Sequence, residues 1–227
     1  VIDYMRRLGV VTPLEAYPSL TLGSASLTPF AVTRMYSALM NDGRFQSLSA
    51  ISSITTHQGD VLYRAPDKNA SQVFDSKVAY LTKFGLHGVV AEGTASALQR
   101  VLAGQQVGGK TGTTNDYRDS WFVAVDGEQV VTAWLGRDDN QPTGLTGSSG
   151  ALRVVADYYE RKPPLSMALE IPEPLKMQRF HERTGQRIPN DCDNGELLPA
   201  EEIRLPDNIT CDGNIEEKSW WDRLFGG

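Results

Sequence analysis

The chain has 227 residues, of which 40% are hydrophobic and 22% are charged, as is typical of one globular domain with extensions. Its formal net charge is −6, and it contains no cluster of lysines and arginines. A nucleic-acid-binding protein is therefore not expected, because such a protein needs a basic surface to neutralise phosphates.

The opening residues, VIDYMRRLGV, place Ile2, Met5 and Leu8 at helical spacing. The stretch is charged and lacks the apolar core of a signal peptide. Because it begins at Val1 and not at Met, we expect it to be the tail of a helix that starts on a longer precursor. No run of the sequence approaches the roughly eighteen apolar residues of a membrane-spanning helix, so no such span is expected.

Residues 28–43 carry the signals of a complete helix. Thr28 is a suitable N-cap, Pro29 fits the first helical position, and Gly43 is a typical stop. Residues 51–65 then alternate imperfectly between apolar and polar side chains around His57–Asp60. This alternation predicts two strands joined by a four-residue turn.

Two further helices and three strands are predicted next. Asp75 is a good N-cap for a helix that runs to Gly93, and Thr94 is expected to cap a shorter helix through residue 102. The stretches 107–114, 120–127 and 128–138 have the composition of strands. Their connections contain Asn115-Asp116 and then Asp126-Gly127, which is predicted to be a two-residue hairpin turn. The expected structure is an antiparallel three-stranded meander.

A helix over residues 150–162 follows, with Leu152, Val155, Ala156 and Tyr159 on one face. We interpret this stripe as core that covers one side of the meander. Prolines at 163, 164, 172 and 174 then interrupt regular structure, and the composition turns polar and acidic. The predicted fold class is α+β: an antiparallel sheet packed with helices over residues 1–165, then an irregular extension over residues 166–227.

The chain contains two cysteines, Cys192 and Cys211, both within this extension. No CxxC motif or neighbouring histidine suggests a zinc site. A disulfide between them would close a loop of about twenty residues, would be worth roughly 3 kcal/mol and would require an oxidising compartment. Two free thiols in a reducing compartment are the alternative.

One short stretch carries the residue types of an active site. Residues 105–122 read QQVGGKTGTTNDYRDSWF and contain Lys110, Thr111, Gly112 and Thr113. Lys-Thr-Gly alone is weak evidence, because such a tripeptide arises by chance and most lysines are solvated. The preceding glycines, the hydroxyl residues around Gly112 and the meander that follows favour a site. In serine acyltransferases that react with penicillin, this tripeptide accompanies a Ser-x-x-Lys nucleophile.

The chemistry of such a strand follows from its residue types. Lys110 supplies positive potential to a substrate carboxylate, and the hydroxyls of Thr111 and Thr113 donate hydrogen bonds to it. Gly112 leaves room for an extended substrate to pair with the strand backbone. The backbone N–H of Thr113 is then available as half of an oxyanion hole.

The chain resembles the C-terminal part of class A penicillin-binding proteins, most of all the 1B type of Gram-negative bacteria. The resemblance covers nearly the whole chain, and the stretches that carry it are PSLTLGSASLTPFAVTRMYSALMNDG, EGTASAL, GGKTGTTNDYRDSWFVAVDG, AWLGRDDNQPTGLTGSSGA and WWDRLFG. It implies an incomplete transpeptidase fold of the penicillin-binding and serine β-lactamase kind. Members are bifunctional synthases in which a membrane anchor and a glycosyltransferase domain precede a transpeptidase domain that β-lactams acylate.

The resemblance assigns Lys110, Thr111, Gly112 and Thr113 to the substrate-binding strand and the Thr113 N–H to the oxyanion hole. It matches Asp119 and Trp121 to the family pattern, where a structural role in strand pairing and packing is expected. Gly93 and Thr94 match a glycine-threonine turn that shapes the helix ahead of the strand.

The nucleophile is missing from the sequence. None of the serines has a lysine three positions later, and no Ser-x-Asn triplet occurs. In the family both motifs lie upstream of the Lys-Thr-Gly strand, so we expect them before Val1. His57, His87 and His181 lie in unrelated segments and suggest no Ser/His/Asp triad. Asp138–Asn140 lacks the alternating acidic ligands of a calcium loop, and neither a metal nor a cofactor is expected.

The resemblance implies a serine-type D-Ala-D-Ala transpeptidase that cross-links peptidoglycan stem peptides at the periplasmic face of the inner membrane, with this fragment inactive alone. Implied partners are the D-Ala-D-Ala donor, the amine acceptor and β-lactam antibiotics. An outer-membrane lipoprotein activator and divisome or elongation proteins would bind through regions outside this chain. The alternative is a non-catalytic module that binds peptidoglycan or a synthase partner. It would be favoured if the same open reading frame encoded neither Ser-x-x-Lys nor a glycosyltransferase ahead of Val1.

The chain ends in KSWWDRLFGG, residues 218–227. Its tryptophans, Leu224 and Phe225 fit a short amphipathic segment that docks on a membrane or a partner. A mobile or loosely packed tail is the alternative interpretation.

Overall fold

The computed structural model describes residues 1–66, 69–202 and 209–214. The chain divides into two compact units, Val1–Leu169 and Glu170–Gly227. The boundary expected from the prolines is at residue 165. Each unit has its own antiparallel three-stranded sheet, and the larger unit contains the Lys-Thr-Gly stretch.

Two helices of the larger unit begin where the capping residues predict. Thr28 accepts a hydrogen bond from the Ala31 N–H, and Asp75 accepts one from the Lys77 N–H, which confirms both N-caps. Gly43 follows the first of these helices with φ of +81°, and its N–H donates to the carbonyl of Ala38. The α-helices are α1 (Ile2–Arg7), α2 (Pro29–Met40), α3 (Ser76–Ala91) and α4 (Ala151–Arg161), and the 3-10 helices are η1 (Pro18–Leu22), η2 (Ser96–Val101) and η3 (Asn115–Tyr117).

The predicted meander is confirmed. Its strands are β5 (Gly108–Thr113), β6 (Ser120–Val125) and β7 (Val130–Leu135), paired antiparallel in the order β5-β6-β7. The register sets Lys110 opposite Val123 and Thr113 opposite Ser120. β5 is therefore an edge strand.

The turn between β6 and β7 is shifted by one residue from the prediction. The Asp126 N–H donates to the Gln129 carbonyl, so Gly127 and Glu128 are the central residues rather than Asp126 and Gly127. The reason is the Asp126 side chain, whose Oδ1 accepts from the N–H groups of Glu128 and Gln129 at 2.8 and 2.9 Å. An aspartate that caps a turn in this way occupies its first position.

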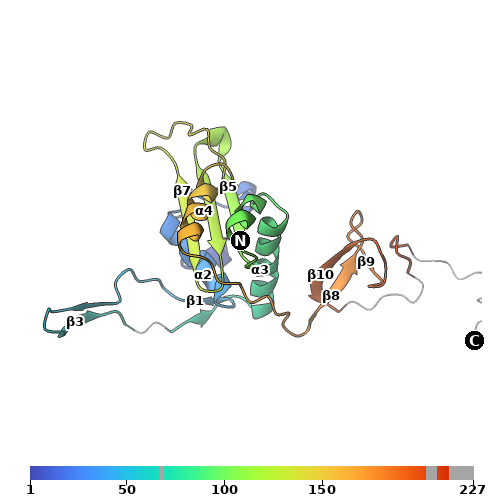
Figure 1. The fold of residues 1–227 in the computed structure, drawn as a ribbon, viewed down its shortest axis with the longest axis horizontal. Coiled ribbons are helices and arrows are strands. Elements are labelled where there is room, and N and C mark those ends of the chain that lie inside the picture. The colour runs from blue at the N-terminus through green and yellow to red at the C-terminus, as the bar shows by residue number, and fades with distance from the viewer. Residues whose placement is uncertain (67–68, 203–208, 215–227) are drawn as a thin grey trace, which may run out of the picture. The chain divides into compact units, whose positions relative to one another are not determined.

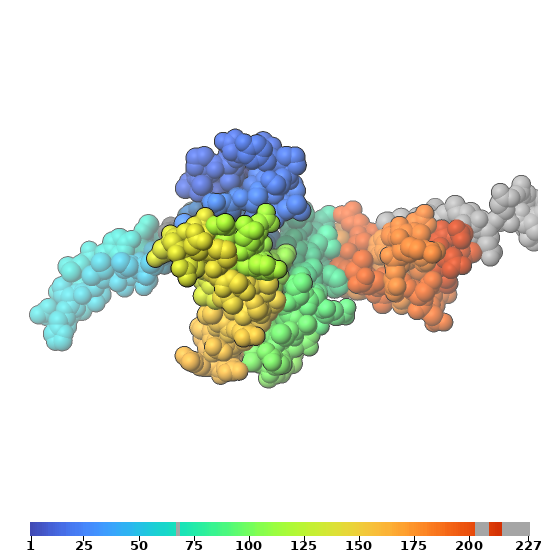
Figure 2. All heavy atoms as spheres, turned by 90° about the horizontal axis from the view of Figure 1, so that it is seen from above, coloured from blue at the N-terminus to red at the C-terminus, as the bar shows by residue number. Residues whose placement is uncertain are grey.

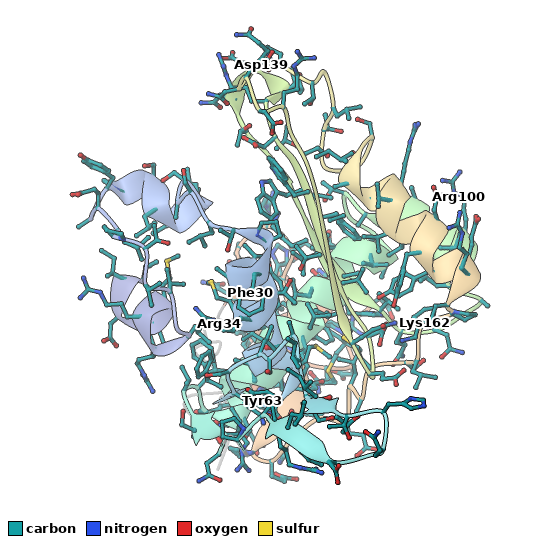
Figure 3. All side chains as sticks on the ribbon, turned by 90° about the vertical axis from the view of Figure 1, so that its left-hand side faces the viewer. Phe30, Arg34, Tyr63, Arg100, Asp139 and Lys162 are labelled. Carbon is teal, nitrogen blue, oxygen red and sulfur yellow. A yellow bond between two sulfur atoms is a disulfide. The ribbon has the colours of Figure 1, made fainter. Side chains whose placement is uncertain are left out.

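Helices cover both faces of this sheet (Figures 1 and 3). Along β6, alternate residues point to opposite faces. Phe122 packs with the apolar stripe of α4, while Val123 packs with Leu86 of α3 and with apolar side chains of α2. The predicted α4 stripe is confirmed as core, since Leu152, Val155, Ala156 and Tyr159 are all buried. Figure 3 shows α4, near Lys162, and α2, which begins near Phe30, on opposite sides of the strands.

Two small strand pairs lie between α2 and α3. The predicted hairpin is confirmed as β2 (Ser53–Thr55) with β3 (Val61–Arg64), and all residues of both strands are exposed. The Thr56 N–H closes its turn by donating to the Asp60 carbonyl at 2.8 Å. β1 (Arg44–Phe45) pairs with β4 (Ser71–Gln72) at the base of this insertion.

The smaller unit contains β8 (Leu175–Phe180), β9 (Arg187–Ile188) and β10 (Glu196–Glu201), with β8 in the centre. A disulfide joins Cys192 to Cys211. It ties the loop before β10 to residues 209–214, a segment with little regular structure of its own. Such a link restricts the unfolded chain and stabilises a unit whose core is small.

Among the described residues, no helix combines the length and the apolar character needed to cross a bilayer. The terminal stretch 218–227, for which docking is one interpretation, lies outside the described residues.

Candidate active site

The Lys-Thr-Gly strand presents a row of backbone donors at the free edge of the sheet. The Thr114 N–H donates to the Asp119 carbonyl at 3.2 Å, which makes Thr114 and Asp119 a hydrogen-bonded pair. Bonded and non-bonded pairs alternate in an antiparallel ladder. Thr113, opposite Ser120, therefore belongs to a non-bonded pair. It follows that the N–H groups of Thr113 and Thr111 point away from β6.

Lys110 brings a positive charge to the same edge. Its side chain is exposed, and its ammonium donates to the carbonyl oxygen of Thr111 at 2.8 Å. Because the N–H and C=O of one strand residue point to the same side, this carbonyl also faces the free edge. The ammonium, the Thr111 N–H and the Thr113 N–H thus lie along one side of β5.

The two threonine hydroxyls of the strand each have a partner. Thr111 Oγ1 lies 2.8 Å from Thr94 Oγ1, and either oxygen can be the donor. Thr113 Oγ1 accepts a hydrogen bond from the Gly147 N–H at 2.9 Å, which leaves its own proton available to donate. Both hydroxyls are consequently oriented before any substrate binds.

The loop before α4 holds β5 and β6 in place. Ser120 is fully buried in β6, and its Oγ donates to the Thr146 carbonyl at 2.7 Å and accepts from the Ala151 N–H at 2.9 Å. Gly147 lies flat on the strands, since a Cβ there would be 2.7 Å from the Trp121 carbonyl oxygen and 2.8 Å from that of Gly112. Figure 2 shows this loop, in yellow, against the lime-green residues that follow β5.

The connection from β5 to β6 is fixed by Asp119. Its carboxylate accepts hydrogen bonds from the Thr114 hydroxyl at 3.0 Å and from the Trp134 indole at 2.9 Å. The rings of Trp121 and Trp134 pack with centroids 6.1 Å apart. The structural role predicted for Asp119 and Trp121 is confirmed.

The prediction that Thr94 caps a helix was wrong. η2 is a 3-10 helix whose N-cap is Ala95, and it has no side-chain cap. The fully buried Ala95 donates its N–H to the Val89 carbonyl of α3, so the chain folds back over the end of that helix. This fold turns Thr94 toward β5, where its hydroxyl contacts Thr111 instead.

Sequence reasoning missed three residues that support the strand, namely Ser120, Thr146 and Gly147. The only signal for Thr146 and Gly147 was the density of glycine and serine in residues 144–150, which indicates a loop and nothing more specific, and Ser120 had only its place in a predicted strand. The close approach of Gly147 to the backbone of β5 and β6 could not be read from that composition.

The arrangement supplies a cation, two oriented hydroxyls and an outward backbone N–H, which together suit a carboxylate and an oxyanion. It does not supply a nucleophile with its base. His57 lies in the β2–β3 turn, His87 in α3 and His181 in the smaller unit, so the three histidines belong to separate segments. Within the described residues, no group of three or more His, Cys, Asp and Glu side chains is placed to hold a metal ion.

Comparison with known proteins agrees with this geometry. Residues 13–154 match the family described as the penicillin binding protein transpeptidase domain. Penicillin-binding protein 1B of Vibrio cholerae is 44% identical over 212 residues, covering 93% of this chain and 27% of the relative. That of Haemophilus influenzae is 40% identical, covering 99% of this chain and 30% of the relative.

A solved structure shares the fold. Penicillin-binding protein 1A of Haemophilus influenzae superposes with a TM-score of 0.74 at 22% identity, covering 87% of this chain and 35% of that protein. The chain thus spans less than a third of the length of the two 1B-type relatives. It belongs to the penicillin-binding protein transpeptidase domain family.

Proposed function

We propose that the chain is part of a serine-type D-Ala-D-Ala transpeptidase that cross-links peptidoglycan stem peptides and is acylated by β-lactams. The family match supports this proposal, and the observation that carries it is the free edge of β5, where Lys110, Thr111 and Thr113 present their donors side by side. The whole protein would be a bifunctional synthase at the periplasmic face of the inner membrane and would also contain a glycosyltransferase domain. An activator and synthase partners would bind through other regions.

In this proposal each residue of the strand has one role. The Lys110 ammonium and the Thr111 and Thr113 hydroxyls bind the terminal carboxylate of the donor peptide, because charge-assisted hydrogen bonds to a carboxylate are stronger than neutral ones. Gly112 lets the extended donor lie against the strand. The Thr113 N–H stabilises the oxyanion that forms at the attacked carbonyl.

The serine would come from a part of the protein outside these 227 residues, since no Ser-x-x-Lys occurs among them. Its Oγ attacks the carbonyl carbon between the two D-alanines, and collapse of the oxyanion expels the terminal D-Ala. The amine of a second stem peptide then attacks the acyl-enzyme, forms the cross-link and returns the serine. The chain on its own should not react with penicillin.

A labelling experiment with fluorescent penicillin tests the assignment. Lys110→Ala in the full-length protein should lower the acylation rate by about ten- to a hundredfold, because one charge-assisted hydrogen bond is worth roughly 1.5–3 kcal/mol. Lys162→Ala is the matched control, since Lys162 is an exposed lysine at the end of α4 that contacts Gln129. Normal acylation of Lys110→Ala would contradict the role proposed for the strand.

A second measurement concerns the origin of the nucleophile. The 227-residue chain should take up no fluorescent penicillin, whereas the full-length protein should be labelled at one serine. Covalent labelling of the chain itself would show that a nucleophile lies within it and would overturn the proposal that the serine comes from another part of the protein.

A further inference from the structure

Thr94 lies outside the Lys-Thr-Gly strand but is joined to it. Its hydroxyl oxygen is 2.8 Å from that of Thr111, although the two residues are seventeen positions apart in the chain. Thr94 does not cap η2, whose N-cap is Ala95. Its hydroxyl is therefore directed at the strand that carries Lys110.

The turn that carries Thr94 is held firmly on both sides. The Gly93 N–H donates to the Gly88 carbonyl and the Ala95 N–H donates to the Val89 carbonyl, both at 3.1 Å. Ala95 is fully buried. A Cβ at Gly93 would lie 2.9 Å from the Val89 Cα and carbonyl oxygen, so this position needs glycine. Thr94 thus approaches Thr111 from a fixed backbone.

The direction of the hydrogen bond between the two hydroxyls decides what Thr111 can do next. If Thr111 donates to Thr94, its single proton is used and it can offer only lone pairs to a ligand. If Thr94 donates to Thr111, the Thr111 proton is free to point elsewhere. A carboxylate accepts hydrogen bonds and cannot donate them, so it selects the second arrangement, and each bond of the resulting chain polarises the next.

We propose that Thr94 is a positioning residue for the substrate carboxylate. It donates to Thr111, which donates to the carboxylate that Lys110 holds. This inference rests on the proposed function and adds a residue from the turn between α3 and η2 to the site. It also gives Thr94 a specificity role, because the hydroxyl chain favours an anionic terminus over a neutral one.

The test uses the full-length protein and compares benzylpenicillin with its methyl ester, in which the carboxylate is neutral. Thr94→Val removes the hydroxyl and keeps the branched side chain, and Thr94→Ser restores the hydroxyl. Thr82→Val is the control, because the Thr82 hydroxyl donates to the Val78 carbonyl within α3. The readouts are the second-order acylation rate constant for each compound and the melting temperature of each variant.

Thr94→Val should lower the rate constant for benzylpenicillin by about five- to tenfold, the equivalent of one hydrogen bond. The slower rate for the methyl ester and the melting temperature should not change. Thr94→Ser and Thr82→Val should behave like the wild type with both compounds.

Failure of the Thr94 proposal can be distinguished from failure of the proposed function. If Thr94→Val slows both compounds equally, or slows neither, the proposal for Thr94 is overturned while the proposed function stands. If benzylpenicillin does not acylate the wild-type full-length protein, the proposed function is overturned, and the role of Thr94 with it.

Discussion

Replacing Ser120 with alanine should show how much the loop before α4 stabilises the fold around the Lys-Thr-Gly strand. Ser120 has no solvent exposure, and its hydroxyl joins the Thr146 carbonyl to the Ala151 N–H. The same loop carries Gly147, whose N–H holds the Thr113 hydroxyl. The substitution removes one oxygen and leaves both backbone groups in place.

The expected cost comes from the Ala151 N–H, because the Thr146 carbonyl still accepts from the Gly150 N–H at 2.9 Å. An unsatisfied buried donor or acceptor costs about 1–3 kcal/mol. Ala151 is buried, so water does not easily replace the lost hydroxyl at its N–H. One such group gives an expected decrease of about 2 kcal/mol in the free energy of unfolding.

Urea unfolding followed by tryptophan fluorescence measures this change, since Trp121 and Trp134 lie in β6 and β7 beside the site. Ser148→Ala is the control in the same loop. Ser148 is exposed and its hydroxyl contacts that of Thr146, at 3.1 Å, so its loss should cost less than about 0.5 kcal/mol. A cost below about 1 kcal/mol for Ser120→Ala would refute the reasoning.

Two further predictions concern backbone approach and pH. Gly147→Ala should reduce penicillin acylation of the full-length protein, because the added Cβ would meet the Gly112 and Trp121 carbonyl oxygens within 2.8 Å. Gly88→Ala in α3, where a Cβ has open space, is the control, and equal acylation by both variants would contradict the prediction. Burial and the Asp126 carboxylate raise the pKa of Tyr159 above its ordinary value of 10.0. Because the folded protein holds the Tyr159 proton more tightly than the unfolded chain does, this tyrosine stabilises the fold fully below about pH 10, and its contribution is lost as the pH rises further. The urea midpoint should therefore fall less steeply with rising pH in Tyr159→Phe than in the wild type. Equal slopes for the two proteins would contradict this prediction.

Much of the fold could be predicted because local signals and tertiary packing agree. Thr28 and Asp75 cap their helices, and the period-3.6 stripe of α4 becomes core. Alternation along β6 likewise matches burial on both faces of the sheet. The fold class and the meander needed no more than these signals.

The errors occurred where specific hydrogen bonds outweighed the preference read from composition. Thr94 has the sequence context of an N-cap, yet the buried Ala95 fixes the chain so that the hydroxyl reaches Thr111. The β6–β7 turn shifted because Asp126 both caps the turn and accepts from the Tyr159 hydroxyl at 3.0 Å. The partner of Thr94 lies on another element, whereas the register of the turn is decided by the Asp126 side chain itself.

The sequence by itself determined which residues have the chemistry for a carboxylate and an oxyanion, because Lys110, Thr111 and Thr113 carry that chemistry in their functional groups and their spacing along a strand. Only the tertiary structure decided which groups surround them. Thr94, Ser120 and Gly147 belong to three other segments that pack around the strand. Contacts between distant segments leave no periodic or local pattern in the sequence, so they could not be predicted from it.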